Sequence, residues 1–254
     1  MSMSSVVERT AGDPPATARR RRGPGAVVQG VLLGLGLVLL IGGFAVIAAG
    51  YRPYGIPTDS MAPTVQAGDT VLARRTDGAD VRRGDVVVFR DAAWGGRLMV
   101  KRVVAVGGDT VGVGTGDQRL TVNGRPVDEP YLAAQGAQGA AFSVEVPPGR
   151  LFLLGDNRLG SLDSRVHLEA DGGTVPAAEV EARVEATVLP FGRAGLLTGT
   201  TAFEAVDGTG PAGPGPLQPA FWACVVGAAT ILATTSVGGV VGLVRRRRRA
   251  ARPR

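Results

Sequence analysis

The sequence predicts a mainly β domain, a compact antiparallel sheet of barrel-like form, flanked by two transmembrane helices. Two long apolar segments without charge lie near the two ends of the 254-residue chain. Between them, short β-branched runs are separated by Gly-Asp and Asn-Gly turns, a pattern typical of strands. The stretch 51–206 shows no convincing long amphipathic helix. These three observations together define the predicted fold class.

The first apolar segment predicts a helix over 26–50. Gly30–Ala49 carries no charge over 20 residues and follows the basic run Arg19–Arg22. A helix of about 20 residues crosses a hydrocarbon core of about 30 Å. A cleaved signal peptide is the alternative, but its apolar region is usually only about 7–15 residues long. The sequence Tyr51–Tyr54 is also a poor cleavage site, which favours a retained span.

The second apolar segment predicts a further membrane span over 220–244. Phe221–Val244 carries no charge over 24 residues and ends at the run Arg245–Arg249. A buried core helix is the alternative interpretation. Five consecutive arginines at the end of the segment argue against it, because basic residues typically flank the cytoplasmic end of a membrane span.

The distribution of charge predicts the orientation in the membrane. The stretches 1–25, 51–220 and 245–254 carry net charges of +3, −4 and +7, within a total of +6. Basic flanks stay in the cytoplasm. We therefore expect a multi-pass protein of the plasma membrane with both termini cytoplasmic and the middle domain outside. A nucleic-acid partner is the alternative for the arginine runs, but their position directly beside apolar spans indicates a lipid bilayer instead.

The remaining organisation follows from composition. The basic stretch 1–25 is polar and is predicted to be a disordered cytoplasmic tail. The extracytoplasmic domain is expected over 51–206. The Gly/Pro-rich stretch 207–219 is typical of an extended linker, and 245–254 forms an Arg-rich cytoplasmic tail.

Short apolar runs place the strands of the middle domain. They lie at 70–73, 85–89, 100–106, 142–146, 151–154, 175–176 and 184–189. Leu120–Val127 predicts a hairpin, because Asn123-Gly124 at its centre suits a type I′ turn. The low-complexity stretch Ala133–Ala140 is interpreted as a surface loop.

Two scarce residue types restrict the chemistry. Cys224, the single cysteine, lies in the second apolar segment, so no intrachain disulfide or thiol pair can form. His167, the single histidine, lies beside charged, loop-like sequence and is interpreted as a surface or supporting residue. One histidine and one membrane cysteine cannot supply a usual zinc site. We predict no metal and no cofactor.

Lys101 is the only lysine in the chain, whereas every other basic side chain is arginine. A lysine in an apolar site can lose its proton near neutral pH, but an arginine cannot. Lys101 lies in Leu98–Val106, which is typical of a buried strand. The alternative is a chance of composition, with the tip of the side chain reaching water. With His167 set aside, Lys101 is the candidate general base.

A base requires a nucleophile, and Ser60 is the candidate. Ser60 lies in the segment Ile56–Thr64, where Pro57 and Pro63 restrict the backbone on either side. A neutral lysine amine can activate a serine hydroxyl by taking its proton. The alternative is an ordinary loop serine without chemistry.

A third segment, Gly155–Arg165, is dense in hydroxyl, amide and charged groups. It directly follows the apolar run Leu151–Leu154. Such a segment is either an ordinary turn or a buried polar network at the end of a strand. Asp163 and Arg165 are placed to pair and stiffen it.

Four motifs in this order resemble those of bacterial type I signal peptidases, the leader peptidase family of membrane-bound Ser/Lys proteases. The resemblance covers 51–193. Its motifs lie at 56–69, 83–89, 101–109 and 155–165. None of them is specific alone, but their order between a leading span and a β domain is.

The resemblance implies the roles of the reacting groups. Ser60 matches the nucleophile and Lys101 the general base. The backbone N–H of Ser60 and the hydroxyl of Thr58 match an oxyanion hole. The family forms an acyl-enzyme by this Ser/Lys dyad and cuts after small residues, typically in an Ala-X-Ala pattern.

The resemblance also implies supporting residues. Ser161 matches the position whose hydroxyl orients the lysine amine, and Asp163 and Arg165 match a structural pair. The expected partners are the signal peptides of exported pre-proteins. This chain departs from the family in its second span at the C-terminal end and in its short β domain, but neither departure affects the motif residues.

Two other functions share part of this pattern. A cytosolic Ser/Lys protease of the self-cleaving repressor type would use the same nucleophile and base, but the two spans speak against it. A membrane-anchored β domain without catalysis would need none of Thr58, Ser60, Lys101 or Ser161. Because all four are present, the sequence favours the enzyme.

Overall fold

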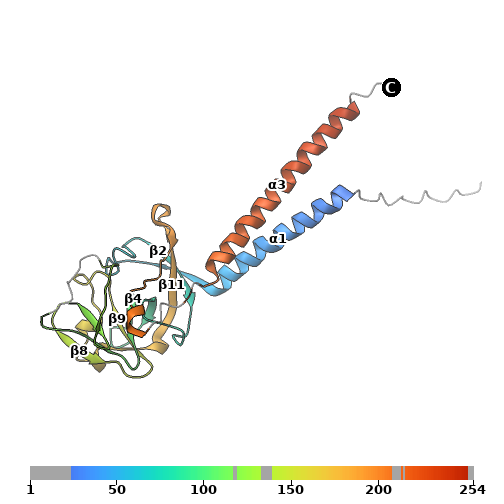
Figure 1. Ribbon diagram of the computed structural model, residues 1–254. Helices are drawn as coiled ribbons and strands as arrows, with labels where there is room; N and C mark the ends of the chain where they lie inside the picture. The colour runs from blue at the N-terminus through green and yellow to red at the C-terminus, as the bar shows by residue number, and fades with distance from the viewer. Residues whose placement is uncertain (1–23, 117–118, 133–138, 208–212, 214, 251–254) are drawn as a thin grey trace, which may run out of the picture. The chain divides into compact units, whose positions relative to one another are not determined.

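The computed structural model describes residues 24–116, 119–132, 139–207, 213 and 215–250 (Figure 1). Four predicted segments lie wholly or partly outside these residues: the tail 1–25, the loop 133–140, the linker 207–219 and the tail 245–254. By its contacts, the chain divides into two compact units. One comprises 40–225, and the other comprises 1–39 together with 226–254.

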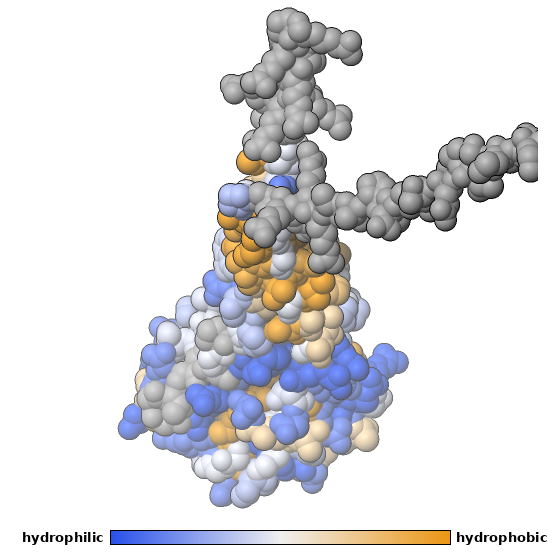
Figure 2. Space-filling view, turned by 90° about the vertical axis from the view of Figure 1, so that its right-hand side faces the viewer, coloured by the Kyte–Doolittle hydropathy of each residue, from blue (hydrophilic) through white to orange (hydrophobic). Residues whose placement is uncertain are grey.

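Two long helices carry the apolar segments. Helix α1 spans Pro24–Gly50 and helix α3 spans Leu217–Ala250. The mean hydropathy of their most apolar windows is 2.7 and 1.7, and both helices are long and apolar enough to cross a membrane. Figure 2 shows apolar residues gathered along the helices, whereas hydrophilic residues cover most of the visible surface of the β domain.

Glycines of α1 allow close contact with α3. A Cβ atom at Gly43 would lie 2.5 Å from the carbonyl oxygen of Ala220 and 2.8 Å from Sγ of Cys224. In the other unit, a Cβ at Gly36 would lie 3.0 Å from the carbonyl oxygen of Gly227. Small residues of this kind let helix backbones approach closely in membranes.

The β domain consists of two antiparallel sheets. The larger sheet has the order β1-β2-β11-β3-β4-β9-β10, with β12 beside β11, and the smaller has the order β7-β6-β5-β8. The strands are β1 Tyr51–Gly55, β2 Thr70–Arg75, β3 Val86–Arg90, β4 Leu98–Val106, β5 Thr110–Val113, β6 Leu120–Val122, β7 Arg125–Pro126, β8 Phe142–Glu145, β9 Arg150–Leu154, β10 Val175–Pro176, β11 Val180–Leu189 and β12 Gly195–Leu196. A short helix, α2 Glu204–Asp207, follows them.

Strands β4 and β9 lie between two hydrophobic cores. Val104 and Phe152 belong to the core that includes the smaller sheet, whereas Val103 and Leu153 belong to the core around Phe89. A strand that is buried on both faces reads as a continuous apolar run. This explains why the sequence around Lys101 shows no alternation of apolar and polar residues.

The register places Lys101 where one edge of β4 becomes free. Lys101 pairs with Val87 of β3. On the other side of β4, strand β9 pairs only with residues from Arg102 onward. The backbone edge of Leu98–Val100 therefore has no strand beside it in the larger sheet. Strand β1 forms the end of the same sheet, so its outer edge is also open.

The predicted fold class, a mainly antiparallel β domain with apolar helices at both ends, is confirmed. The hairpin is also confirmed, because Asn123 and Gly124 have φ angles of 54° and 73°, as a type I′ turn requires. The sequence did not predict β1, which contains Pro53, or β5, which contains Gly112. Proline is tolerated in β1 because that strand lies at a sheet edge.

Candidate active site

Ser60 and Lys101 lie in direct contact. The Nζ atom of Lys101 donates a hydrogen bond of 2.9 Å to Oγ of Ser60. Ser60 lies in a turn between β1 and β2 and is half-buried, whereas Lys101 on β4 is only 4% exposed. Two residues that are 41 positions apart are thus brought together, as the sequence analysis predicted.

The surroundings of Lys101 favour the neutral amine. Burial lowers the pKa of Lys101 to about 8, and the nearby carboxylates of Asp163 and Asp156 oppose this effect. The amine also donates a hydrogen bond of 3.1 Å to the carbonyl oxygen of Val100. Removing a charge from water disfavours the protonated form. The amine of Lys101 is therefore partly neutral near physiological pH.

Thr58 lies beside the nucleophile oxygen. Its exposed hydroxyl donates a hydrogen bond of 3.4 Å to Oγ of Ser60. The backbone N–H of Ser60 has no hydrogen-bond partner within the described part of the chain. Two donors therefore lie next to the hydroxyl oxygen of Ser60, and the N–H of Ser60 has no acceptor among the described residues.

Hydrogen bonds join the two ends of the segment that carries Ser60. The N–H of Ile56 donates to the carbonyl of Asp69, and the N–H of Gly68 donates to the carbonyl of Ile56, both at 2.8 Å. The buried carboxylate of Asp69 accepts from Nε of Arg193 at 2.8 Å. We call 56–69 the nucleophile segment. These bonds form it into a loop with fixed ends.

The segment 155–165, called here the polar segment, holds the nucleophile segment from the other side. The N–H of Asn157 donates to the carbonyl of Ser60 at 3.1 Å, and its side-chain amide donates to the carbonyl of Asp59 at 3.2 Å. The hydroxyl of Thr64 donates to Asp156 at 2.5 Å. The position of Ser60 therefore depends on how the polar segment is held.

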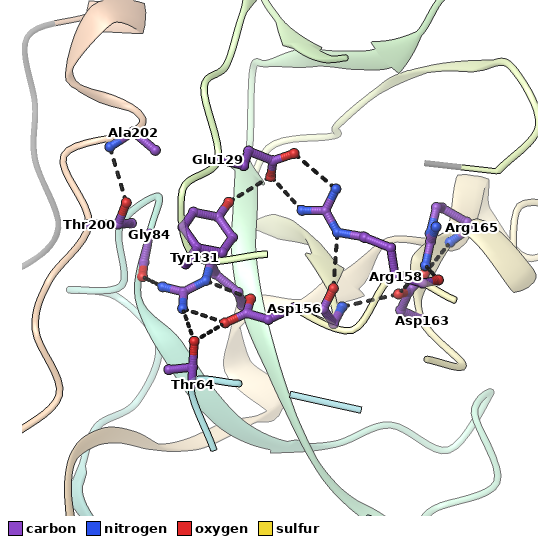
Figure 3. Close-up of polar contacts among 12 residues, drawn as sticks. Thr64, Gly84, Glu129, Tyr131, Asp156, Arg158, Asp163, Arg165, Thr200 and Ala202 are labelled. Carbon is purple, nitrogen blue, oxygen red and sulfur yellow. Dashed lines mark hydrogen bonds and ion pairs between the residues drawn. The ribbon is translucent and has the colours of Figure 1, made fainter. Parts of the chain in front are cut away.

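A buried ion pair fixes Asp156 (Figure 3). Arg102 donates to the two oxygens of Asp156 from Nε at 2.8 Å and from Nη2 at 2.6 Å. Its Nη1 donates to the carbonyl of Gly84 at 2.7 Å. The guanidinium lies over the ring of Tyr131, 4.1 Å from the ring centre, where a cation–π contact is favourable.

A second buried pair fixes Arg158. Both oxygens of Glu129 accept from this guanidinium, and the hydroxyl of Tyr131 also donates to Glu129, at 2.6 Å (Figure 3). Nε of Arg158 donates to the carbonyl of Gly155 at 3.0 Å. The loop that contains Glu129 and Tyr131 thus supports the polar segment.

The predicted pair of Asp163 and Arg165 is confirmed. Nε and Nη2 of Arg165 each donate to a different oxygen of Asp163 at 2.8 Å. Asp163 also accepts from the N–H of Gly155 at 3.0 Å, and Arg165 donates to the carbonyl of Arg158 at 2.7 Å. Both backbone polar groups of Gly155 are therefore held by buried charged side chains.

Ser161 lies in the same region but makes no hydrogen bond to Lys101 in this structure. Its Oγ is buried and has no partner within the described residues. It packs against Gly155, where an added Cβ would overlap the Ser161 side chain and come within 2.5 Å of the carbonyl oxygen of Ser60. Its expected role in orienting the amine stays a prediction.

His167 is separate from this arrangement. Its ring stacks on Trp94, with the ring centres 4.4 Å apart. No hydrogen bond joins it to Ser60 among the residues described. Nor does the described part of the chain contain a group of three or more side chains that could hold a metal ion.

The sequence analysis missed several residues of the site. Arg102 and Asp156 lay inside the quoted motifs without an assigned role, and Glu129 and Tyr131 lay outside them. The signal for Glu129 was weak: it is the second of two adjacent acidic residues, Asp128 and Glu129, directly before a proline. Only the fold shows that Glu129 is buried, with an exposure of 3%.

Comparisons with known proteins show the family of this chain. The family model described as signal peptidase, peptidase S26, matches residues 28–189. The chain belongs to this family, and the predicted resemblance to bacterial type I signal peptidases is confirmed. It is accordingly a peptide-bond hydrolase of the signal peptidase type.

Curated relatives carry the same description. The chain is 36% identical over 199 residues to a signal peptidase I of Mycobacterium tuberculosis, covering 58% of this chain and 67% of the relative. It is 35% identical over 155 residues to signal peptidase I U of Bacillus subtilis, covering 56% of this chain and 78% of the relative. A solved signal peptidase I from Enterococcus faecalis is 30% identical, covers 40% of this chain and 94% of that chain, and has a TM-score of 0.34.

We expect Gly155→Ala to reduce kcat by about 10²-fold, since displacement of a reacting group by about 1 Å costs that much. The added methyl group has no room between Ser161 and the carbonyl of Ser60. Cleavage kinetics of the purified variant, with circular dichroism to verify folding, test this. Gly116→Ala is the control, because a Cβ there meets nothing within 4 Å. A folded Gly155→Ala variant with wild-type kcat would contradict the tight contact.

Proposed function

We propose that this protein removes signal peptides from exported pre-proteins through an acyl-enzyme formed by a Ser60/Lys101 dyad, cutting after small residues of an Ala-X-Ala pattern. The observation that carries the proposal is the contact of 2.9 Å between the buried amine of Lys101 and the hydroxyl of Ser60. No other nitrogen base contacts this hydroxyl within the described residues, and His167 is stacked elsewhere.

The reaction follows from this contact. Ser60 Oγ attacks the carbonyl carbon that precedes the cleavage point, and the neutral amine of Lys101 takes the hydroxyl proton. The tetrahedral intermediate collapses, the C–N bond breaks, and Lys101 gives the proton to the leaving amine. Water then attacks the ester, with Lys101 again accepting a proton, and the Ser60 hydroxyl is restored.

The oxyanion is stabilised by two donors. The unused N–H of Ser60 and the hydroxyl of Thr58 both lie beside Oγ of Ser60. Donors that are held in place where negative charge develops lower the barrier without reorganisation. The hydroxyl of Ser161, which is buried without a partner, is available to orient the Lys101 amine during the cycle.

The free backbone edge of Leu98–Val100 suits an extended substrate, because a peptide can add to an open edge as a further strand. This edge ends at Lys101, so a peptide lying on it reaches the dyad. Behind Ser60, the side chains of Ile56, Met61 and Val65 are already packed in a hydrophobic core. Because these side chains are already packed, we expect the pocket for a substrate side chain to be shallow and apolar, which favours residues as small as alanine.

The membrane brings enzyme and substrate together. Signal peptides are themselves apolar helices, so anchoring by α1 and α3 raises the effective concentration of the cleavage point. From the basic flanks of both spans we expect the termini in the cytoplasm and the β domain outside. Incubation of the detergent-solubilised protein with a pre-protein, followed by sequencing of the new N-terminus, tests the proposed function.

We expect Lys101→Arg to abolish cleavage while the protein stays folded. Arginine keeps the positive charge but cannot act as a base. The rate of pre-protein cleavage is the measurement, with His167→Ala as a matched control that keeps most of the activity. Retention of a tenth of wild-type turnover by Lys101→Arg would remove Lys101 from the mechanism, and a thousandfold loss in His167→Ala would indicate a Ser/His mechanism instead.

We expect Thr58→Ala to lower kcat roughly 10² to 10³-fold with little change in KM, because the hydroxyl meets the oxyanion only in the transition state. Thr58→Ser should restore most of the activity. Thr58→Val keeps the shape and lacks the hydroxyl, so it should be as damaging as Ala. Steady-state kinetics of the three variants decide this. If the valine variant were nearly as active as wild type, Thr58 would act only by packing.

We expect both termini to be cytoplasmic, since basic residues flank both apolar spans. Reporter fusions after residue 254 and within the β domain measure the side of the membrane on which each lies. Protease treatment of intact cells provides an independent control. External access to Arg245–Arg254 would contradict the arrangement with two spans.

A further inference from the structure

Two buried carboxylates act on the amine of Lys101 through their charge, and both come from the polar segment. They belong to Asp156 and Asp163, which are 1% and 0% exposed. Among the described residues, the groups that contact Lys101 from other elements are neutral: β3 pairs with it through Val87, and the nucleophile segment presents the hydroxyl of Ser60. These carboxylates favour the protonated amine, which is the form that cannot act as a base.

Each of these carboxylates is bound at both oxygens by an arginine. Arg102 binds Asp156 at 2.8 and 2.6 Å, and Arg165 binds Asp163 with two bonds of 2.8 Å. A bidentate guanidinium is the strongest charged partner that a carboxylate finds in proteins. Neither arginine can be deprotonated, so both pairs keep their charges at any pH at which the enzyme works.

The third pair, Arg158 with Glu129, completes a balanced set. The three carboxylates and three guanidinium groups are joined through Tyr131 and the backbone of the polar segment (Figure 3). Lys101 is therefore not required as the counter-ion of any carboxylate in this set. Its amine bonds instead to two neutral acceptors, Oγ of Ser60 and the carbonyl of Val100.

We propose that Arg165 and Arg102 are positioning residues that act as fixed counter-charges, binding Asp163 and Asp156 so that these carboxylates do not hold the Lys101 amine in its protonated form. The inference rests on the proposed function, since it explains how the dyad keeps a usable base. Without Arg165, the buried carboxylate of Asp163 loses its bidentate cation, and the amine of Lys101 loses its proton only at higher pH.

The direction of the effect follows from charge alone. Removing a guanidinium leaves one carboxylate uncompensated, which raises the pKa of Lys101, whereas removing the carboxylate itself lowers it. An opposite charge within about 4–6 Å changes a pKa by roughly one to three units. Burial lowers the pKa of Lys101 to about 8, whereas the two carboxylates raise it. Loss of either guanidinium would strengthen the effect of the carboxylates and raise the pKa further.

The composition of the chain offers a direct measurement. Because Lys101 is the only lysine, the full-length protein labelled with ¹³C-lysine gives one side-chain signal in detergent micelles. The pH dependence of its ¹³Cε shift reports the protonation of this amine independently of activity. The acid limb of kcat/KM in a cleavage assay provides a second readout of the free enzyme.

The test compares Arg165→Gln with Arg165→Lys. We expect the glutamine variant to titrate about one pH unit higher than wild type, because a buried carboxylate has lost its charged partner. The acid limb of kcat/KM should move by the same amount. In the lysine variant, which keeps the charge, the Lys101 signal should titrate close to wild type. The introduced lysine gives a second signal, which is assigned by comparison with the wild-type spectrum. Arg90→Gln, which removes an exposed arginine paired with Glu181, should leave the titration unchanged.

A second series keeps the test independent of folding defects in one variant. Asp163→Asn should titrate below wild type, and the double variant with Arg165→Gln should return towards it. Equal titration of wild type and Arg165→Gln would overturn the proposal, as would a fall in kcat without movement of the acid limb. The proposed function is tested separately by a Lys101→Met variant. Cleavage by that variant would contradict the proposed function, independently of the titration result.

Discussion

The arrangement of the site depends on the bonds that hold the backbone of Gly155. Its N–H donates to Asp163 and its carbonyl accepts from Arg158, while its missing side chain leaves room for the carbonyl of Ser60. A buried ion pair contributes little net stability, but removing one partner of such a pair costs about 3–5 kcal/mol. The charged groups therefore act less as a source of stability than as a constraint on conformation. They allow one arrangement of the polar segment, and that arrangement fixes Ser60.

The sheet imposes a second constraint on the same site. Strand β4 must be buried on both faces near Arg102 and open along Leu98–Val100, and β9 achieves this by ending its pairing at Arg102. Lys101 lies at the boundary between the two parts. Lys101 is only 4% exposed, and its amine bonds to Ser60 and to the carbonyl of Val100 next to the free edge. Under the proposed function, one strand supplies both the buried base and the edge on which an extended peptide would lie.

Much of this could be predicted from the sequence, because several residues have strong local signals. The turn at Asn123-Gly124 and the lone Lys101 in an apolar run are examples. The roles of Glu129 and Tyr131 could not be predicted, since they depend on contacts across the fold with Arg158 and Arg102. Strands such as β1 were missed because local propensity disfavours proline in strands, whereas the edge position of β1 makes it harmless. The features that could not be predicted are mainly those that depend on contacts between residues far apart in the sequence.

The contrast between lysine and arginine gives the composition of the chain a physical meaning. The permanent positive charges that hold the polar segment, on Arg102, Arg158 and Arg165, are guanidinium groups that remain charged and bind carboxylates with two parallel bonds. Under the proposed mechanism, the group that changes its charge is the single lysine, Lys101. Replacing a guanidinium by an ammonium would keep the positive charge but lose the two parallel bonds that a guanidinium makes to a carboxylate. A site that needs one movable proton is best surrounded by cations that cannot release theirs.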